Sequence, residues 1–148
     1  MYVITDPMKI YEHECRVRDE FARGLQNHRA GELLARTEQR YKGTLLRADM
    51  RTVDKSDLIR EWEFKINADY KALGQILQYV ALARQAESFR PIRGVIAAFS
   101  FTPEIIIANE VMNLNLELVV IPGWLRRSGY INEYSAASLP RIPYAPSL

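Results

Sequence analysis

Polar and apolar side chains alternate along residues 58–66, a pattern that predicts a β-strand. Successive side chains of a strand point to opposite faces, so one face of this strand is largely apolar and the other carries charge. The largely apolar face consists of Leu58, Arg60, Trp62, Phe64 and Ile66. The charged face consists of Ile59, Glu61, Glu63 and Lys65. Burying a charged group is costly unless it is paired or holds a metal. The charged face is therefore the first candidate for a functional site.

The segment before this strand predicts a second strand, joined to the first by a polar turn at residues 54–57. Asp49 lies on it, so in an antiparallel hairpin its carboxylate can face Glu63 and Lys65. Hard cations such as Mg²⁺ prefer carboxylate oxygens and keep several waters. We expect Asp49 and Glu63 to bind Mg²⁺, with Mn²⁺ as a substitute, and the backbone carbonyl of Phe64 to complete the shell. Lys65 is expected to assist the attacking water or to stabilise phosphoryl charge.

A first helix is predicted over residues 7–25, with Asp6 as its N-cap and Pro7 at the first helical position. Its apolar stripe is Ile10, Val17, Phe21 and Leu25. Glu14 falls inside this stripe, which is unusual for a carboxylate. One interpretation is an acid at the edge of the stripe that extends to solvent or pairs with Arg18. The other is a metal ligand that the helix delivers to the hairpin.

Residues 26–43 fit either a short helix or a connection between a helix and a strand. Glu32 is a weaker candidate than Glu14 for the acidic role. Basic residues cluster here and continue into the next strand, which fits either a solvated surface or contacts to phosphates. The candidates for DNA contact are Arg36, Arg40, Lys42, Arg47 and Arg51.

A second helix is predicted over residues 69–87, with a cap in the Asn67–Asp69 segment. Gln75 and Tyr79 lie four residues apart, so both project from one flank of this helix, near Lys65. They can support the site, or they can be an ordinary rim glutamine and a tyrosine at the edge of the core.

The C-terminal half alternates strands with a helix. The apolar run at residues 94–99 predicts a central strand buried on both faces. Thr102 and Pro103 begin a helix, and residues 116–121 predict a last strand. The expected order is α, β, β, α, β, α, β. It makes an α/β fold with a small mixed sheet, an antiparallel hairpin plus a parallel βαβ half, flanked by helices on both faces.

Length and composition are consistent with a single domain over residues 1–148, with a core at about residues 7–122. Residues 123–148 contain Pro140, Pro143 and Pro146 and are expected to be loose, or to dock on a partner through Tyr130, Tyr134 and Tyr144.

The lone Cys15 excludes a disulfide framework and cysteine-held clusters. No apolar run has the length of a membrane span or the character of a signal peptide, so we expect no membrane association and a cytoplasmic protein.

The runs ADM and EWEFK, followed by GQILQY, resemble the PD-(D/E)XK nuclease superfamily, which has a restriction-endonuclease-like fold. Its motif residues would be Asp49, Glu63 and Lys65, while Gln75 and Tyr79 match the signature of its RecB-like members. Residues 43–122 resemble more closely the catalytic domain of the NucS (EndoMS) type of mismatch endonuclease. The resemblance implies a Mg²⁺-dependent nuclease acting on DNA, with the helix acid of the superfamily at Glu14.

Two departures limit what the resemblance implies. Ala48 stands where the superfamily often has proline, a common variation. The separate N-terminal DNA-binding and dimerisation domain of the NucS type has no counterpart in this sequence, so mismatch recognition is not implied.

We therefore expect a DNA nuclease in repair, processing or defence, acting as a homodimer or with a protein partner that provides specificity. One alternative is a catalytically silent nucleic-acid-binding or assembly subunit with the same fold. The other is an unrelated domain in which Glu63 and Lys65 form only a surface ion pair.

Overall fold

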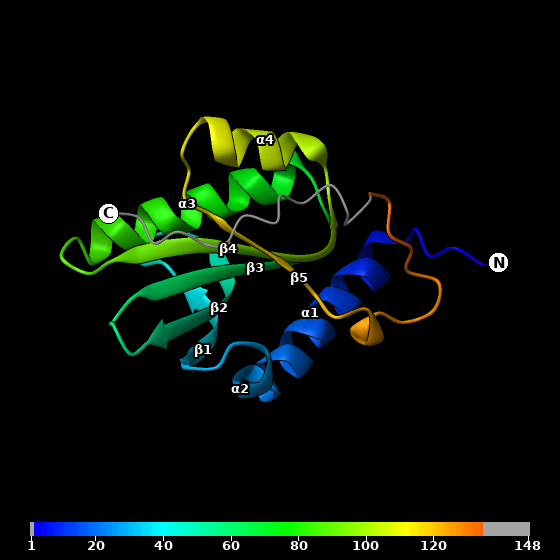
Figure 1. Ribbon diagram of the computed structural model, residues 1–148, viewed down its shortest axis with the longest axis horizontal. Helices are drawn as coiled ribbons and strands as arrows, with labels where there is room; N and C mark the ends of the chain where they lie inside the picture. The colour runs from blue at the N-terminus through cyan, green and yellow to red at the C-terminus, as the bar shows by residue number, and fades with distance from the viewer. Residues whose placement is uncertain (1, 135–148) are drawn as a thin grey trace.

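The computed structural model describes residues 2–134 and contains one five-stranded mixed sheet, ordered β1-β2-β3-β4-β5 (Figure 1). Strands β1, β2 and β3 are antiparallel, whereas β3, β4 and β5 are parallel. The strands are β1 Glu32–Arg40, β2 Arg47–Asp54, β3 Ile59–Ala68, β4 Ile92–Phe101 and β5 Glu117–Val120. The helices are α1 Pro7–Arg23, α2 Leu25–His28, α3 Tyr70–Ala86 and α4 Pro103–Val111, and a 3₁₀ turn, η1, spans Gly123–Leu125. The predicted combination of a hairpin and a parallel half is confirmed.

Helices cover both faces of the sheet and form two hydrophobic cores (Figure 1). On one face, α1 packs Val17 and Phe21 against Trp62 and Phe64 of β3. The core on the other face lies between α3, α4 and the sheet. Its members include Ile59, Ile76, Tyr79, Ile96, Phe101 and Ile105. Strand β3 therefore has one apolar face, and its charged face lies on the side of α3.

The predicted helix starts agree with the structure. The Asp6 carboxylate accepts a hydrogen bond from Met8 N, and Pro7 is the first residue of α1. Asp69 caps α3, and Thr102 caps α4. These caps depend on local backbone geometry, which a few neighbouring residues specify.

Residues 26–43 contain an element that the expected order lacks. They form the short helix α2 and then β1, an edge strand, so the chain has five strands among residues 2–134 and not four. Only Glu32 and Gln39 of β1 are buried, and its pairing with β2 shifts register between Leu34 and Arg36. A strand exposed over most of its length shows no hydrophobic alternation. For this reason the sequence pattern did not distinguish a helix from a strand in this segment.

Strand β4 is buried at all ten positions, as its apolar run predicts. Gly94 is required there by close packing, because a Cβ at this position would lie 2.7 Å from Leu116 Cδ2 and 2.8 Å from Ile76 Cγ1. This contact sets how closely α3 approaches the sheet.

The described part of the C-terminal extension, residues 123–134, contacts its own domain. The Tyr130 hydroxyl donates to Lys9 O at 3.2 Å, and Arg127 N donates to His13 Nε2 at 3.2 Å. Tyr134 N donates to Ser100 Oγ at 3.3 Å. Tyr144 lies outside the described residues. Within residues 2–134, no helix combines the length and the apolar character needed to cross a bilayer.

Candidate active site

The site forms where β3 continues beyond its antiparallel neighbour. The ladder between β2 and β3 ends at the pair Met50 and Trp62, and β3 runs on to Ala68. Beyond the ladder, Phe64 N donates to Asp49 Oδ2 at 2.7 Å, and Ile66 N donates to Glu14 Oε2 at 2.9 Å. Two carboxylates from different elements therefore take the backbone N–H groups that β2 leaves free.

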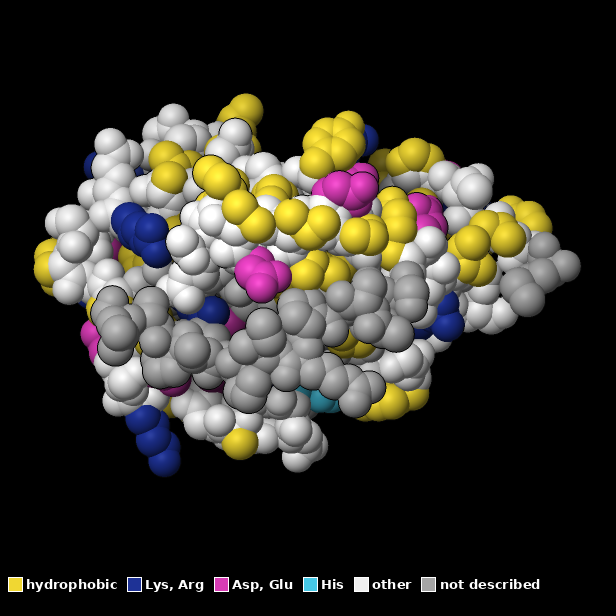
Figure 2. All heavy atoms as spheres, turned by 45° about the horizontal axis from the view of Figure 1, so that its top comes forward, with side chains coloured by type: hydrophobic (Ala, Val, Ile, Leu, Met, Phe, Trp, Pro, Cys, Tyr) yellow, Lys and Arg dark blue, Asp and Glu magenta, His cyan; other side chains and the backbone are white. Residues whose placement is uncertain are grey.

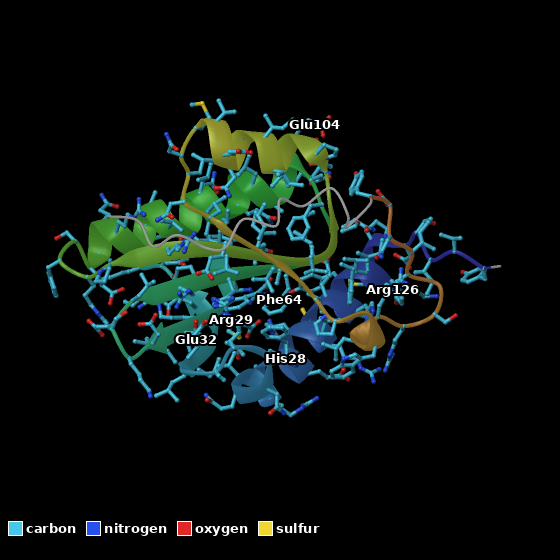
Figure 3. All side chains as sticks on the ribbon, in the orientation of Figure 1. His28, Arg29, Glu32, Phe64, Glu104 and Arg126 are labelled. Carbon is cyan, nitrogen blue, oxygen red and sulfur yellow. The ribbon has the colours of Figure 1, made fainter. Side chains whose placement is uncertain are left out.

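The same geometry orients the backbone carbonyl of Phe64. The N–H and C=O of one strand residue point to the same side of the strand. Because Phe64 N–H bonds to Asp49, the carbonyl faces the side from which Asp49 approaches. Phe64 lies in the middle of the sheet, where Figure 3 labels it. This position is compatible with the predicted carbonyl ligand.

Asp49 and Glu63 form a closely coupled pair of carboxyl groups. Burial raises the pKa of both groups, and the neighbouring Asp49 charge raises the pKa of Glu63 further. Glu63 Oε2 is buried and has no hydrogen-bond partner among the described residues. Lys65 Nζ lies 3.8 Å from Glu63 Oε1, and its side chain is 24% exposed. Glu63 thus has a buried oxygen without a partner and, on its other oxygen, a neighbouring lysine that reaches solvent.

Glu14 joins this pair from α1. Burial raises the pKa of Glu14 to about 7, while the Lys65 charge and the bond from Ile66 N oppose the shift. Pairing with Arg18, the alternative drawn from the sequence, does not occur, since the Arg18 guanidinium bonds to Asp19 at 3.0 Å. The structure thus places Glu14 with the candidate carboxylates.

Gln75 and Tyr79 lie on α3, which covers the charged face of β3. Tyr79 is buried, and its pKa is raised first by burial and then by the Glu63 and Asp49 charges, which lie close to its hydroxyl. Gln75 precedes Tyr79 by about one turn, and its Oε1 is buried without a hydrogen-bond partner in the described chain. Such orphaned oxygens suit a bound ligand, because buried polar atoms otherwise find partners.

Arg18 is a site residue that the pattern analysis did not select. It is 8% exposed, and its positive charge lowers the pKa of Asp49 against the effect of burial. The sequence carries a usable signal for it, since Arg18 follows Glu14 by four residues and so shares a helix flank with it.

Two predicted residues lie elsewhere. Glu32 is on β1, where it accepts bonds from Arg29 Nε at 2.6 Å and Thr52 Oγ1 at 2.8 Å (Figure 3). The weaker prediction for Glu32 is therefore wrong, because a strand and an ion-pair network hold it away from Asp49. The prediction that Arg51 contacts DNA is also wrong, since Arg51 is buried and its Nε bonds to Glu61 Oε1 at 2.7 Å.

The other basic candidates reach solvent. Arg36, Arg40 and Lys42 are exposed on β1 and the loop after it. Arg47 begins β2 with 40% of its side chain exposed, and its Nη2 donates to the Tyr11 hydroxyl at 3.2 Å. This pair joins β2 to α1 beside Asp49. A contact between these residues and DNA stays a prediction.

The donor atoms fit a hard divalent cation. Residues 2–134 contain no group of three or more His, Cys, Asp and Glu side chains arranged as a preformed metal site. Mg²⁺ does not need one, because it keeps several waters and takes one or two carboxylates. Asp49, Glu63 with its orphaned Oε2 and the Phe64 carbonyl supply such a set, and a cation would offset the cost of burying both carboxylates and the Asp49 charge that raises the pKa of Glu63.

Similar solved structures carry the same fold. EndoMS bound to double-stranded DNA matches with a TM-score of 0.61 and 20% identity, over 78% of this chain and 46% of that one. A repair endonuclease from Pyrococcus abyssi matches with a TM-score of 0.57 and 18% identity, over 82% and 50%. The fold of this chain is nuclease-like. EndoMS in its apo form gives a TM-score of 0.56 and 19% identity, over 74% and 47%.

The resemblance to the NucS (EndoMS) type is thus confirmed at the level of the fold. No family model and no curated protein matches the sequence. The chain spans about half the length of the solved structures it matches. Similarity of fold does not assign a role to any residue, so the functional argument has to come from the site.

Proposed function

We propose that this chain is a metal-dependent nuclease that hydrolyses phosphodiester bonds in DNA. One observation carries the proposal: the end of β3 gathers Asp49, Glu63, Glu14 and Lys65 at the point where its pairing with β2 ends. The similar structures, which include a repair endonuclease and EndoMS bound to double-stranded DNA, support DNA as the substrate.

In this proposal Asp49 and Glu63 hold Mg²⁺, or Mn²⁺ in its place, together with the Phe64 carbonyl. Bound there, the ion supplies charge neutralisation and acidifies a water. Glu14 accepts the Ile66 N–H and so fixes α1 against β3, close to the pair. Lys65, half-buried beside Glu63, orients the attacking water and donates to the phosphoryl oxygens.

Positively charged side chains around the pair would bind the phosphates of the strand. Arg18 lies beside Asp49 with its guanidinium mostly buried, so its positive charge acts on the carboxylate and favours its ionised form. Arg47 and Tyr11, linked at 3.2 Å, flank the same carboxylate from β2 and α1. Gln75 and Tyr79 support the site from α3, the helix that covers the charged face of β3.

A cleavage assay tests the proposal. Linear, nicked, single-stranded and branched DNA are incubated with the protein in Mg²⁺, in Mn²⁺ or in EDTA. We expect cleavage with either metal, none in EDTA, and a loss of about 100-fold or more for Lys65→Ala, in the range that removal of one charge-stabilising group costs. Asp49→Asn is expected to lose activity and Mn²⁺ binding together.

Lys55→Ala is the matched control, because Lys55 is an exposed lysine in the turn between β2 and β3. It should cleave like the wild type. If the wild type and Lys65→Ala behave alike on every substrate, the nuclease proposal fails. Metal-dependent DNA binding without cleavage would instead identify a silent binding or assembly subunit.

A further inference from the structure

The charged face of β3 holds a second buried carboxylate, two residues before Glu63. Glu61 is completely buried. Its Oε1 accepts from Arg51 Nε at 2.7 Å, its Oε2 accepts from Arg51 Nη2 at 3.3 Å, and the Tyr41 hydroxyl also bonds to Oε2. Arg51 in turn pairs with Glu87 at the C-cap of α3, with 2.8 Å between Nη1 and Oε2. Removing one partner of a buried ion pair is strongly destabilising, so each member of this network is held by the others.

Tyr41 links this network to the candidate active site. It lies in the loop after β1 and is 6% exposed. Its carbonyl accepts from Thr44 N at 3.1 Å and from Thr44 Oγ1 at 3.0 Å, so both ends of the residue are held. Its ring stacks on the ring of Tyr79, with 5.9 Å between centroids and 15° between planes. Tyr79 is the residue whose hydroxyl lies close to Glu63.

We infer that Tyr41 is a positioning residue for the candidate active site: it holds the Tyr79 ring in place, and through that ring the carboxylate of Glu63. The inference rests on the proposed function for its kinetic consequences. The Glu61 and Arg51 pair holds the Tyr41 hydroxyl in place. The Tyr41 ring then restricts the orientation of the Tyr79 ring on α3. The Tyr79 hydroxyl, in turn, restricts the position of the Glu63 carboxylate.

Two substitutions separate positioning from stability. Tyr41→Phe keeps the stacked ring and removes the bond to Glu61, so it should lower the melting temperature and lower kcat less than Tyr41→Leu does. Tyr41→Leu removes the stack. Partners that orient a metal ligand from outside typically contribute about 10-fold or more to activity or metal affinity. We therefore expect Tyr41→Leu to lower kcat about 10-fold, with KM for DNA almost unchanged.

A double-mutant cycle with Tyr79→Phe tests the route. Tyr79→Phe keeps the ring and removes the hydroxyl that faces Glu63. If Tyr41 acts through that hydroxyl, adding Tyr41→Leu to Tyr79→Phe should change kcat little further, because residues in one chain of contacts are not additive. Effects that multiply in the double variant would overturn the inference.

The control is Ile105→Ala, which removes side-chain volume from the same core on α4. If Ile105→Ala lowers the melting temperature as much as Tyr41→Leu does, it should still leave kcat unchanged. An equal fall in kcat for the two variants would show that Tyr41 has only a structural role. Mn²⁺ affinity, measured by electron paramagnetic resonance, is a readout independent of cleavage. It should weaken in Tyr41→Leu and not in Ile105→Ala, even if no substrate is cut. Unchanged or undetectable Mn²⁺ binding would overturn the inference, whereas absent cleavage alone contradicts only the nuclease proposal.

Discussion

At the scale of residues, Asp49 and Glu14 show how a strand end becomes a reactive site. Each carboxylate bonds to a β3 backbone N–H that would otherwise lack a partner in the ladder. The bond holds the side chain in place, and burial at that position raises its pKa. The backbone bond itself lowers the pKa, so the raised pKa comes from burial, which prepares the carboxyls to exchange a proton for a cation.

Glu14 provides a pH prediction. Its pKa rises from 4.5 to about 7 on folding, so between these values the folded chain binds the proton more strongly than the unfolded chain. The contribution of Glu14 to stability is therefore complete below pH 4.5 and is lost as the pH rises towards 7. In EDTA, we expect the melting temperature of the wild type to fall relative to that of Glu14→Gln over this range.

The difference between the two proteins reports the loss of the Glu14 carboxyl, together with the part of the Glu63 pKa shift that its charge causes. His13, whose pKa is lowered by burial, acts in the opposite direction but is present in both. Saturating Mg²⁺ should reverse the trend, because the cation binds the deprotonated carboxylates. Thermal melts at several pH values check this. A wild type that gains stability relative to Glu14→Gln between about pH 5 and 7 in EDTA would contradict it.

At the scale of elements, the approach of α3 to the sheet decides whether Tyr79 reaches Glu63. Gly94 on β4 permits this approach, because Ile76 and Val80 of α3 occupy the space that a Cβ would need. The parallel pairing of β3 with β4 then fixes the position of Gly94 opposite Glu61. The position of Tyr79 in the site thus depends on the close packing of α3 against Gly94 of β4.

A matched pair of glycine substitutions tests this packing. Gly94→Ala should destabilise the fold by about 1–3 kcal/mol, the usual cost of extra volume in a packed core. Gly74 lies inside α3, and a Cβ added there would have no atom within 4 Å. Gly74→Ala should therefore stabilise the fold by about 0.5–1 kcal/mol. Urea unfolding measures both. Similar values for the two variants would contradict the close packing at Gly94.

At the scale of the whole molecule, α4 presents an apolar outer face. Ile107, Val111 and Met112 are 57%, 69% and 68% exposed, and Figure 2 shows hydrophobic side chains gathered on this side of the molecule. Exposed apolar patches of this kind mark interfaces. We propose that a second copy of the chain covers this face in a symmetric homodimer, the commonest oligomer, which would bring two sites to one DNA.

Sedimentation or light scattering tests the homodimer. We expect a dimer mass at micromolar concentration and a monomer mass for Val111→Lys, since a buried lysine would lack a partner at a two-fold interface. Leu33→Lys is the control, because Leu33 is 68% exposed on β1, at the far edge of the sheet. A monomeric wild type would remove the proposal.

The sequence by itself determined the elements whose information is local. Alternation over residues 58–66 predicted β3, caps at Asp6 and Thr102 predicted the helix starts, and the apolar run of β4 predicted a buried strand. It also predicted that Asp49, Glu63 and Lys65 would meet, because a hairpin brings together residues that are close in the chain.

Only the tertiary structure decided the contacts between distant segments. It placed Glu14 and not Glu32 beside Asp49, because α1 reaches the end of β3 while Glu32 pairs with Asp54, at the opposite end of β2. It bonded Arg51 to Glu61 and stacked Tyr41 on Tyr79. Periodicity reports which face of an element a residue occupies. Which element lies opposite that face depends on long-range packing, which a local pattern does not encode.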